Sequence, residues 1–377
     1  MKRERRLVRG VQIAILTIAS AWLAAVSAFA GNALEVGPGH TYATIQAAAN
    51  AAQSGDAVLV YPGQYPESVT VRKNYISFLA QGDGVIVGPP PQEGEACFDV
   101  RADGVVIHGF ELTGTNCAPA IHFLGSHNRF SKNQVYGLTC PGVNALECRD
   151  PDGGSNYNII EDNDVTEADL GIIVGSDSNS AVNKGNVIAG NFVHGVGAVG
   201  IGVYNGVDTT ITGNTIMYIP FGWGISVSTP ISKTPQQNIV VTANKITDVA
   251  EGGIGIFADA KCNMKKIFVG YNEISSTGGY GILLQLQDKA KLSDCTLSGN
   301  TVKEADHMGI VVDAGVEKNT LEGNLTVGNG EYGILVIGKN NTLEGNTSMG
   351  NGTCDMQDRG KNNTWKDNVY QTSACSH

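Results

Sequence analysis

The chain has 377 residues, of which 49 are glycine and only 16% are charged, a composition typical of short strands joined by many tight turns. The formal net charge of −11 argues against nucleic acid or an anionic membrane surface as the main partner. The net charge does not exclude an acidic polysaccharide as a partner, because a local basic patch can outweigh the repulsion from more distant negative charges.

Residues 1–30 have the three parts of a secretory signal. The apolar stretch Val11 to Val26 is followed by the small-X-small sequence Ala28-Phe29-Ala30, and basic residues precede it: Lys2, Arg3, Arg5, Arg6 and Arg9. An uncleaved anchor is the alternative, because the apolar stretch approaches the length that spans a membrane. We therefore expect a secreted or periplasmic protein that has no membrane contact after signal cleavage.

Export would place the eight cysteines in an oxidising compartment, which favours disulfides over metal ligands. Three pairs are separated by about one repeat along the chain, and a fourth would close a local loop. The predicted pairs are Cys97–Cys117, Cys262–Cys295, Cys354–Cys375 and Cys140–Cys148. A metal site built from Cys117, Cys140 and Cys148 is the alternative, but no Cys-X-X-Cys supports it, and we predict no metal ligands.

A five-residue pattern, any-any-Asn-any-Val/Ile, recurs along the chain, and residues 212–216 are a clear copy. A Gly-Ile-X-Val/Leu run precedes most copies. The asparagines are Asn133, Asn163, Asn191, Asn214, Asn244, Asn272, Asn300, Asn324, Asn346 and Asn368. A period of roughly 20–30 residues predicts a solenoid. We expect these asparagine side chains to stack in line at one turn of each coil.

The opening of the mature chain adds a family resemblance. Residues 42–48, 55–60 and 62–67 (Tyr-Ala-Thr-Ile-Gln-Ala-Ala, Gly-Asp-Ala-Val-Leu-Val and Pro-Gly-Gln-Tyr-Pro-Glu) resemble the start of right-handed parallel β-helix proteins of the pectin-lyase-like superfamily. The resemblance covers residues 36–370 and implies an all-β solenoid with three short strands per coil. It implies little about activity, since the superfamily contains lyases, hydrolases, epimerases, adhesins and binding proteins.

We therefore expect one β-helix domain over residues 31–377. Residues 31–90 would form an N-terminal cap, with a helix over residues 41–52, and the first coils. Residues 91–370 would form regular coils and residues 371–377 a tail. The coils between residues 133 and 300 carry the longer loops, which favours the middle of the solenoid as the functional region. We expect a monomer.

Counting forward from each Gly-Ile run predicts which side chains of the first strand point outward. The polar members of one outward column are Tyr204, Ser228, Asp259, Gln285 and Asp313. In the pectin-lyase-like superfamily this first sheet lines the polysaccharide groove. Asp259 and Asp313 would lie two coils apart, about 9–10 Å, near the upper limit for a carboxylate pair with water between them. The alternative is that these side chains are only solvent-exposed surface residues without a role in binding or catalysis.

Candidate residues follow from this column and its neighbouring turns. The predicted catalytic residues are Asp259, Asp313, His307 and Lys261, with His307, Lys261 or a tyrosine as base. The predicted substrate-binding residues are Tyr204, Trp223, Ser228, Gln285 and Tyr280, because flat aromatic rings stack on sugar faces. We expect His122 and His194 to be surface or turn residues. The loop of residues 149–152 resembles the Asp-Pro-His loop of mannuronan epimerases but has Asp152 where the histidine would stand.

The favoured hypothesis is a secreted carbohydrate-active protein that acts on an acidic polysaccharide as lyase, hydrolase or epimerase. The alternative is a non-catalytic β-helix that binds glycan or serves a structural role in the cell envelope or periplasm. No cofactor is predicted, and a calcium ion in the groove stays open.

Overall fold

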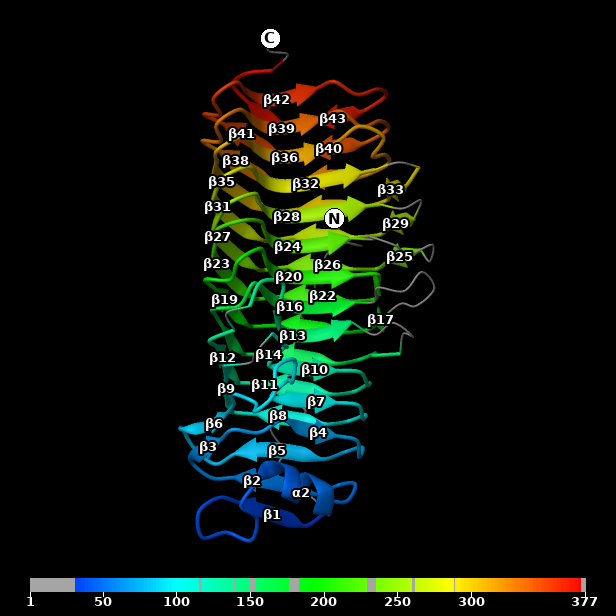
Figure 1. The fold of residues 1–377 in the computed structure, drawn as a ribbon. Helices are drawn as coiled ribbons and strands as arrows, with labels where there is room; N and C mark the ends of the chain where they lie inside the picture. Colours follow the sequence, from blue (N-terminus) through cyan, green and yellow to red (C-terminus); the bar gives the residue numbers. More distant parts are fainter. Residues whose placement is uncertain are drawn as a thin grey trace.

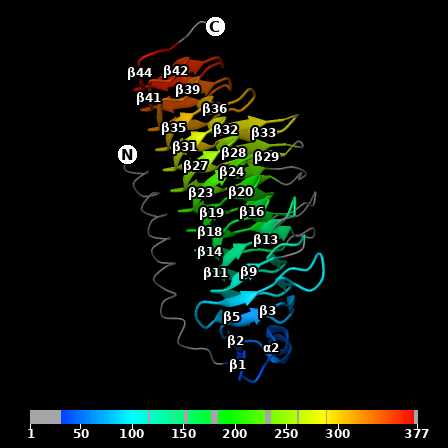
Figure 2. The same ribbon diagram turned by 60° about the vertical axis from the view of Figure 1, so that its left-hand side comes forward.

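In the computed structural model, the apolar run of each repeat forms a short strand, and the chain coils upward from β1 to β44 (Figure 1). The structure describes residues 31–114, 117–138, 140–149, 154–175, 183–228, 235–259, 262–287 and 289–373. Three long parallel sheets run the length of this stack, as both ribbon views show (Figure 2). The predicted right-handed, three-sheet parallel β-helix is therefore confirmed.

Sheet 1 contains the Gly-Ile runs and has 12 strands. Its strands are β4 (Val69–Val71), β7 (Phe98–Val100), β10 (Ile121–Phe123), β13 (Asn144–Arg149), β16 (Leu170–Gly175), β20 (Val199–Tyr204), β24 (Trp223–Ser228), β28 (Gly252–Ala258), β32 (Tyr280–Leu286), β36 (Met308–Val312), β39 (Tyr332–Val336) and β42 (Cys354–Asp358). In Figure 1 this sheet faces the viewer.

Sheet 2 follows sheet 1 along each coil and has 14 strands. Its strands are β1 (Ala33–Val36), β2 (Ala57–Val60), β5 (Ser77–Ala80), β8 (Val106–His108), β11 (Arg129–Ser131), β14 (Ile159–Glu161), β18 (Val187–Ala189), β22 (Thr210–Thr212), β26 (Val240–Thr242), β30 (Phe268–Gly270), β34 (Thr296–Ser298), β37 (Thr320–Glu322), β40 (Thr342–Glu344) and β43 (Thr364–Lys366).

Sheet 3 completes each coil and has 13 strands. Its strands are β3 (Gly63–Tyr65), β6 (Val85–Val87), β9 (Glu111–Thr113), β12 (Gln134–Tyr136), β15 (Asp164–Val165), β19 (Phe192–His194), β23 (Thr215–Ile219), β27 (Lys245–Val249), β31 (Glu273–Thr277), β35 (Thr301–Ala305), β38 (Leu325–Val327), β41 (Thr347–Met349) and β44 (Val369–Tyr370).

The turns from sheet 1 to sheet 2 lengthen in the middle of the solenoid and form two small sheets. One contains β17 (Asn183–Lys184) and β21 (Gly206–Val207). The other contains β25 (Gln236–Gln237), β29 (Asn263–Lys265) and β33 (Lys291–Ser293). The predicted longer excursions of the middle coils are thus confirmed, and they border one edge of sheet 1.

A short helix, α2 (Ile45–Ala51), caps the first coil. Its buried residues Ile45, Ala48 and Ala49 cover apolar core that no lower coil covers. The Glu67 carboxylate accepts hydrogen bonds from the backbone amides of Ile45 and Gln46 at 2.8 and 2.9 Å, which satisfies the unpaired N–H groups of the helix start. The predicted helix is confirmed, although it begins four residues later than expected.

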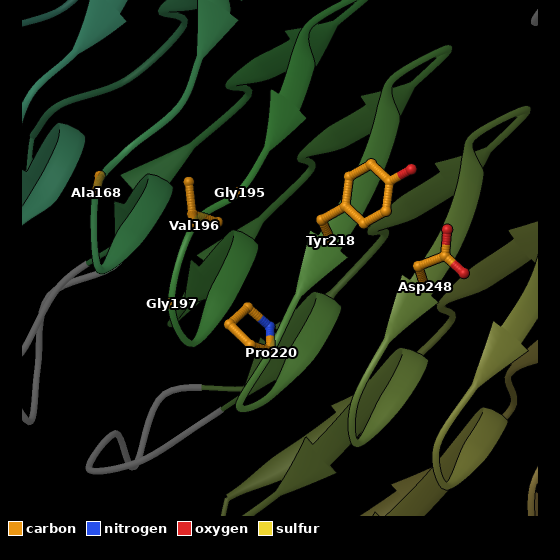
Figure 3. A pocket seen from close by; sticks show the side chains of 7 residues that line it. All are labelled: Ala168, Gly195, Val196, Gly197, Tyr218, Pro220 and Asp248. Carbon is orange, nitrogen blue, oxygen red and sulfur yellow. The ribbon is translucent and has the colours of Figure 1, made fainter.

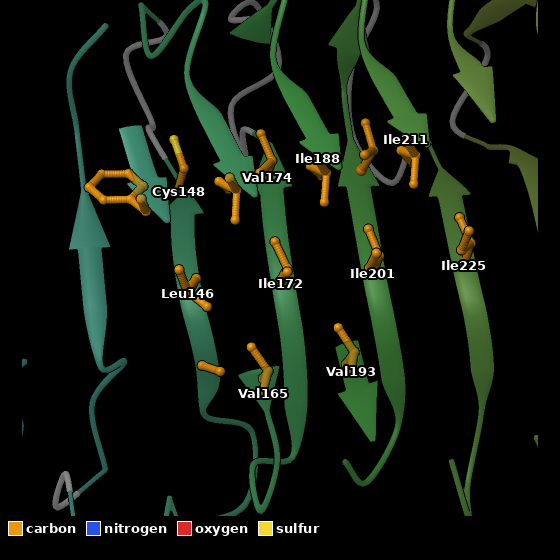
Figure 4. Close-up of a cluster of buried hydrophobic side chains, with 14 of the residues drawn as sticks. Leu146, Cys148, Val165, Ile172, Val174, Ile188, Val193, Ile201, Ile211 and Ile225 are labelled. Carbon is orange, nitrogen blue, oxygen red and sulfur yellow. The ribbon is translucent and has the colours of Figure 1, made fainter. Parts of the chain in front are cut away.

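Inward side chains of the three sheets fill the interior with aliphatic and phenylalanine side chains (Figure 4). Ile172, Ile201 and Ile225 follow one another on successive strands of sheet 1, and all three are fully buried. Val193 of sheet 3 and Ile188 of sheet 2 close the same core from the other sides. Each coil buries apolar groups against the coils above and below, which makes stability depend on stacking.

The asparagine stack lies at the turn from sheet 2 to sheet 3. Asn163 shows the repeated arrangement: its Nδ2 donates to Asn191 Oδ1 at 2.9 Å and to the Phe130 carbonyl at 3.0 Å. The same side-chain bond links every successive pair of the predicted asparagines from Asn133 to Asn368. The stack satisfies the buried polar groups of the turn, so its predicted structural role is confirmed.

Further asparagine stacks escaped the sequence reasoning. Asn158 and Asn186 bond to each other at the turn from sheet 1 to sheet 2, and Asn319 and Asn341 do so in later coils. These stacks are interrupted, because Thr209 occupies the equivalent turn position above Asn186. An interrupted repeat gives a weaker sequence signal than the continuous one.

The disulfides differ from the predicted pairs. Cys117 is bonded to Cys140 and not to Cys97, which remains a buried thiol. Phe98 pairs with Ile121 on the next coil, and the same offset places Cys117 over Cys140 and not over Cys97. Cys148 points into the core from β13 and is a thiol, so the predicted bond between Cys140 and Cys148 is wrong as well.

Cys262 and Cys295 are also thiols, because more than one coil separates them. Asn263 pairs with Lys291 on the next coil, which places Ala290, and not Cys295, beside Cys262. Cys354 is disulfide-bonded, and Cys375, its predicted partner, lies outside the described residues. Among the described residues, no helix has the length and apolarity needed to cross a membrane.

Candidate functional site

The outward side of sheet 1, called the outer face here, carries three columns of side chains that follow the strand register. The middle column runs Thr70, Asp99, His122, Glu147, Ile173, Gly202, Ser226, Gly255, Leu283, Val311, Leu335 and Gln357. A column at the strand starts includes Trp223, Gly252 and Tyr280, and one at the strand ends includes Tyr204, Ser228, Phe257 and Gln285.

All five predicted substrate-binding residues lie on strands of sheet 1. Trp223 and Tyr280 belong to the column at the strand starts. Tyr204, Ser228 and Gln285 belong to the column at the strand ends. The structure therefore brings these residues to one face, and their role in binding stays a prediction.

Asp259 does not occupy the column in which it was predicted. Ser228 pairs with Phe257, and Phe257 pairs with Gln285, so Phe257 is the column member of that coil. The error has a local cause: Gly253-Ile254 and Gly255-Ile256 are two consecutive Gly-Ile pairs, and the first pair is the one in register with the neighbouring coils. Asp259 follows the end of β28, two residues beyond the column.

Asp313 keeps its predicted place beside Gln285. Its carboxylate accepts a hydrogen bond from Gln285 Nε2 at 3.0 Å and another from the Ala314 amide at 2.7 Å. Because Asp259 is offset along the strand, the two aspartates do not form the pair that the column predicted.

His307 lies at the opposite edge of sheet 1 from Asp313. It precedes β36, whereas Asp313 follows the same strand, so the two residues are separated by about 20 Å of extended chain. His307 Nδ1 and Glu331 Oε1 are 2.9 Å apart, and the imidazole is 58% exposed. Lys261 lies outside the described residues. The predicted catalytic residues among the described ones therefore do not converge.

Three aromatic rings form a platform on the outer face. Trp223 and Phe257 meet edge to face with centroids 5.0 Å apart, and Tyr280 is parallel to Trp223 at 6.2 Å. Two glycines make room for them. A Cβ on Gly252 would lie 2.4 Å from the Trp223 ring, and one on Gly255 would lie 2.2 Å from the Phe257 ring. The rings thus lie close over the sheet, and all three are only partly buried, as a stacking surface for a sugar requires.

An ionisable cluster lies on the first coils of the same face. The Asp99 carboxylate contacts two basic side chains: His122 Nδ1 at 3.0 Å and Arg101 Nε at 2.9 Å. Glu147 follows His122 in the middle column, on the next strand. Asp99 and His122 are about one-quarter exposed, and Arg101 is 43% exposed, so this cluster is accessible from the outer face.

The electrostatics of the cluster keep Asp99 ionised. Burial raises the pKa of this carboxyl, but the hydrogen bonds and charges of His122 and Arg101 outweigh burial and hold its pKa below the ordinary value. In the tautomer that carries its proton on Nδ1, His122 donates a hydrogen bond to the ionised Asp99, and Nε2 is then the ring nitrogen that can accept a proton.

Sequence reasoning predicted His122 as a surface or turn residue but did not connect it with Asp99. The first coils lack the Gly-Ile mark from which the columns were counted. A weaker signal was present: single polar residues flanked by apolar ones recur as Phe98-Asp99-Val100, Ile121-His122-Phe123 and Leu146-Glu147-Cys148. Aligning these triplets would have placed the three ionisable residues in one column.

Comparison with known proteins identifies the class. The family model for the right-handed β-helix region matches residues 116–283 and 263–348, more than half of the chain, so the chain belongs to this family. No curated protein sequence matches the chain.

Several solved structures share the fold. The Dettilon tailspike protein gp208 is 12% identical with a TM-score of 0.53 over 83% of this chain, which spans 62% of the tailspike's length. The periplasmic alginate epimerase AlgG is 14% identical with a TM-score of 0.54, over 84% of this chain and 77% of the epimerase. The catalytic unit of an α-1,3-glucanase from Streptomyces thermodiastaticus is 12% identical with a TM-score of 0.52, over 88% and 67%. At these identities the likeness shows the fold alone.

Proposed function

We propose that this protein is an exported lyase or epimerase that binds an acidic polysaccharide along the outer face of sheet 1. The observation that carries the proposal is the Asp99 carboxylate, which holds the His122 imidazole and the Arg101 guanidinium on one accessible surface. Both reactions begin with removal of the proton at C5 of a uronate, which needs a base and a cation beside the sugar carboxylate.

His122 is the proposed base. Its Nδ1 proton is held by Asp99, so Nε2 takes the C5 proton and the electron pair moves onto the uronate carboxylate. In elimination, the electron pair returns from the carboxylate to form the C4–C5 double bond, the C4–O4 bond breaks, and the departing oxygen takes a proton from the imidazolium. In epimerisation, the electron pair returns from the carboxylate to C5, a water on the opposite face of the sugar gives C5 a proton, and the resulting hydroxide is neutralised by the proton of the imidazolium.

Arg101 is the proposed partner of the sugar carboxylate. Its Nε is used by Asp99, and the side chain is 43% exposed, so the guanidinium can offer its remaining N–H groups to a second carboxylate. It would neutralise the charge that builds on the uronate when C5 loses its proton, which is the larger part of the barrier in such reactions.

Tyr204 and the aromatic platform would together hold the polysaccharide chain. Tyr204 lies three strands beyond His122 and Trp223 four strands beyond, at about 14 and 19 Å along the solenoid. A polysaccharide lying along the axis would therefore contact the base and the rings at once. Solved β-helix relatives include an alginate epimerase and an α-1,3-glucanase, which supports a polysaccharide as the ligand.

Turnover of defined polysaccharides tests the proposal. The full mature chain would be incubated with polymannuronate, polyguluronate, polygalacturonate and neutral glucan, and the products followed by unsaturated ends, reducing ends and C5 configuration. We expect unsaturated ends or inverted C5 centres on at least one polyuronate and none on glucan. Reducing ends without unsaturation would indicate hydrolysis instead, and binding without any turnover would support the non-catalytic alternative.

Export is supported by the signal-like residues 1–30 and by the Cys117–Cys140 disulfide, which forms in oxidising compartments. The mass of the mature protein from its natural host tests this directly. Cleavage after Ala30 predicts a chain that begins at Gly31, and a full-length chain retained in membranes would contradict it.

A further inference from the structure

A hollow of about 500 Å³ opens where the chain passes from sheet 3 to sheet 1 (Figure 3). Its volume lies in the range of small-molecule sites, about 300–1,000 Å³. Its lining residues are Ala168, Gly195, Val196, Gly197, Tyr218, Pro220 and Asp248. Pro220 stands three residues before Trp223, so the hollow borders the outer face without belonging to it.

Gly195 presents no side chain to the space beside Tyr218, whereas the next two coils carry side chains at the equivalent position. His194 pairs with Met217 and Met217 with Thr247, so the residues that follow them, Gly195, Tyr218 and Asp248, occupy one position on successive coils. A Cβ on Gly195 would meet only the Thr166 hydroxyl, at 3.3 Å. The missing side chain leaves open space next to Tyr218.

Tyr218 stands near the end of β23, at a backbone position that suits a smaller residue. Its φ is +57°, in the left-handed region, and its side chain is 59% exposed. Asp248 has the same conformation on the next coil, and a short polar side chain tolerates it better than a bulky ring does. Three other exposed tyrosines in this conformation each cover a glycine on the next coil, as the pairs Tyr75 and Gly104, Tyr157 and Gly185, and Tyr271 and Gly299. Tyr218 has Asp248 there instead of a glycine, which favours a role for its ring other than packing.

The lining has the chemistry of a sugar site. The exposed Tyr218 ring and Pro220 offer apolar surface, and the fully buried Val196 forms part of the floor behind them. Asp248 lies on β27, which neighbours the strand of Tyr218, β23, at a spacing of about 5 Å. Its carboxylate offers hydrogen-bond acceptors beside the ring. A pyranose has an apolar C–H face that stacks on an aromatic ring and hydroxyls that donate to a carboxylate.

The charges around the hollow select among sugars. The surrounding strand ends and turns, residues 166–169, 195–198, 218–222 and 248–251, contain no lysine or arginine. They contain four acids: Glu167, Asp169, Asp248 and Glu251. A uronate would meet like charges here, whereas a neutral pyranose would not.

We infer that this hollow is a second carbohydrate site that binds a neutral pyranose residue, separate from the ionisable cluster around His122. The site would let the protein hold a neutral branch or a neutral segment of a glycan at the edge of the outer face. It does not depend on whether the protein is catalytic, because its residues differ from those proposed for the reaction.

Binding of neutral tetrasaccharides of glucose, mannose and galactose to the full mature chain tests the inference, by calorimetry and by ligand-observed magnetic resonance. We expect at least one to bind with a Kd in the millimolar range or below. Tyr218→Ala should weaken that binding about tenfold, and Tyr218→Phe should retain it, because the ring supplies the stacking. Tyr271→Ala is the matched control, a similar exposed tyrosine on another turn, and should leave the Kd unchanged.

Two results would overturn the inference: no tetrasaccharide binds at millimolar concentrations, or Tyr218→Ala binds as tightly as the natural protein. A tetrauronate that binds as tightly and with the same dependence on Tyr218 would contradict the selection for neutral sugars. His122→Ala should leave neutral-sugar binding intact, which separates this site from the proposed reaction.

Discussion

The outer face of sheet 1 differs strongly between its first and last coils, although the strands stack in the same register. On β7, β10 and β13 the middle column is Asp99, His122 and Glu147. On β32, β36 and β39 the same column is Leu283, Val311 and Leu335, which form an apolar cluster with Tyr332 and Cys354.

The difference shows that the β-helix does not require ionisable residues on this face. Leu283, Val311 and Leu335 cover the late coils and are 2–5% exposed, so apolar side chains satisfy the position well. Asp99 and His122 occupy equivalent places while three-quarters buried, where ionisable groups need partners to offset desolvation. The first coils thus carry the features of a reaction site, and the last coils carry those of stabilising packing.

Replacing the proposed base gives the largest expected effect. His122→Ala should lower turnover of a responsive polyuronate by about 100- to 10,000-fold, because general base catalysis typically contributes that factor. The variant should unfold at nearly the same denaturant concentration as the natural protein. Asp313→Ala and His307→Ala are the comparison variants, and a greater loss in either of them would move the site away from the first coils.

Truncating a side chain of the late apolar cluster should lower stability and leave turnover nearly unchanged, the opposite of what we expect for His122→Ala. Leu335 is 2% exposed within the late cluster, so Leu335→Ala should lower the free energy of unfolding by about 2–5 kcal/mol. Turnover below the unfolding transition should change little. Denaturant unfolding measures the stability, and initial rates on the same preparation measure the turnover. A Leu335→Ala variant that is stable but inactive would contradict the proposed difference between the two regions.

Removing the shared carboxylate should give a smaller, pH-dependent effect on stability. The folded pKa of Asp99 is lowered, so its contribution is present above the ordinary carboxyl pKa of about 3.9 and is lost as pH falls through the lower folded value. Asp99→Asn should therefore be less stable than the natural protein near neutral pH, with the gap closing in acid. A gap that stays constant from pH 7 to pH 2 would show that the ionisation of Asp99 contributes nothing.

The fold could be predicted because its signals repeat without interruption. Each asparagine from Asn133 to Asn368 bonds to the next, so the stack needs the same residue at every coil, and the sequence shows it. The interrupted stacks of Asn158 and Asn186 gave no such regular signal. Because each coil of a solenoid contacts only its neighbours, this regular spacing is enough to predict the order in which the coils stack.

The site was harder to predict because it depends on register to within one residue. Because two adjacent Gly-Ile pairs precede Asp259, counting from the second pair predicted it in the column, whereas the structure places it two residues beyond. The coils differ in length, so cysteines that an average repeat length predicts to be neighbours do not lie beside each other in the structure. Asp99 and His122 come from different coils, and only the pairing of β7 with β10 reveals their contact. Such contacts follow from the local coil length, which loops change freely.

Hydrogen exchange at C5 of a polyuronate in deuterated water tests the central claim most directly. If the cluster around His122 is the reaction site, the natural protein should introduce deuterium at C5 or yield unsaturated ends, and His122→Ala should do neither while remaining folded. Deuterium uptake that persists undiminished in His122→Ala would contradict the account.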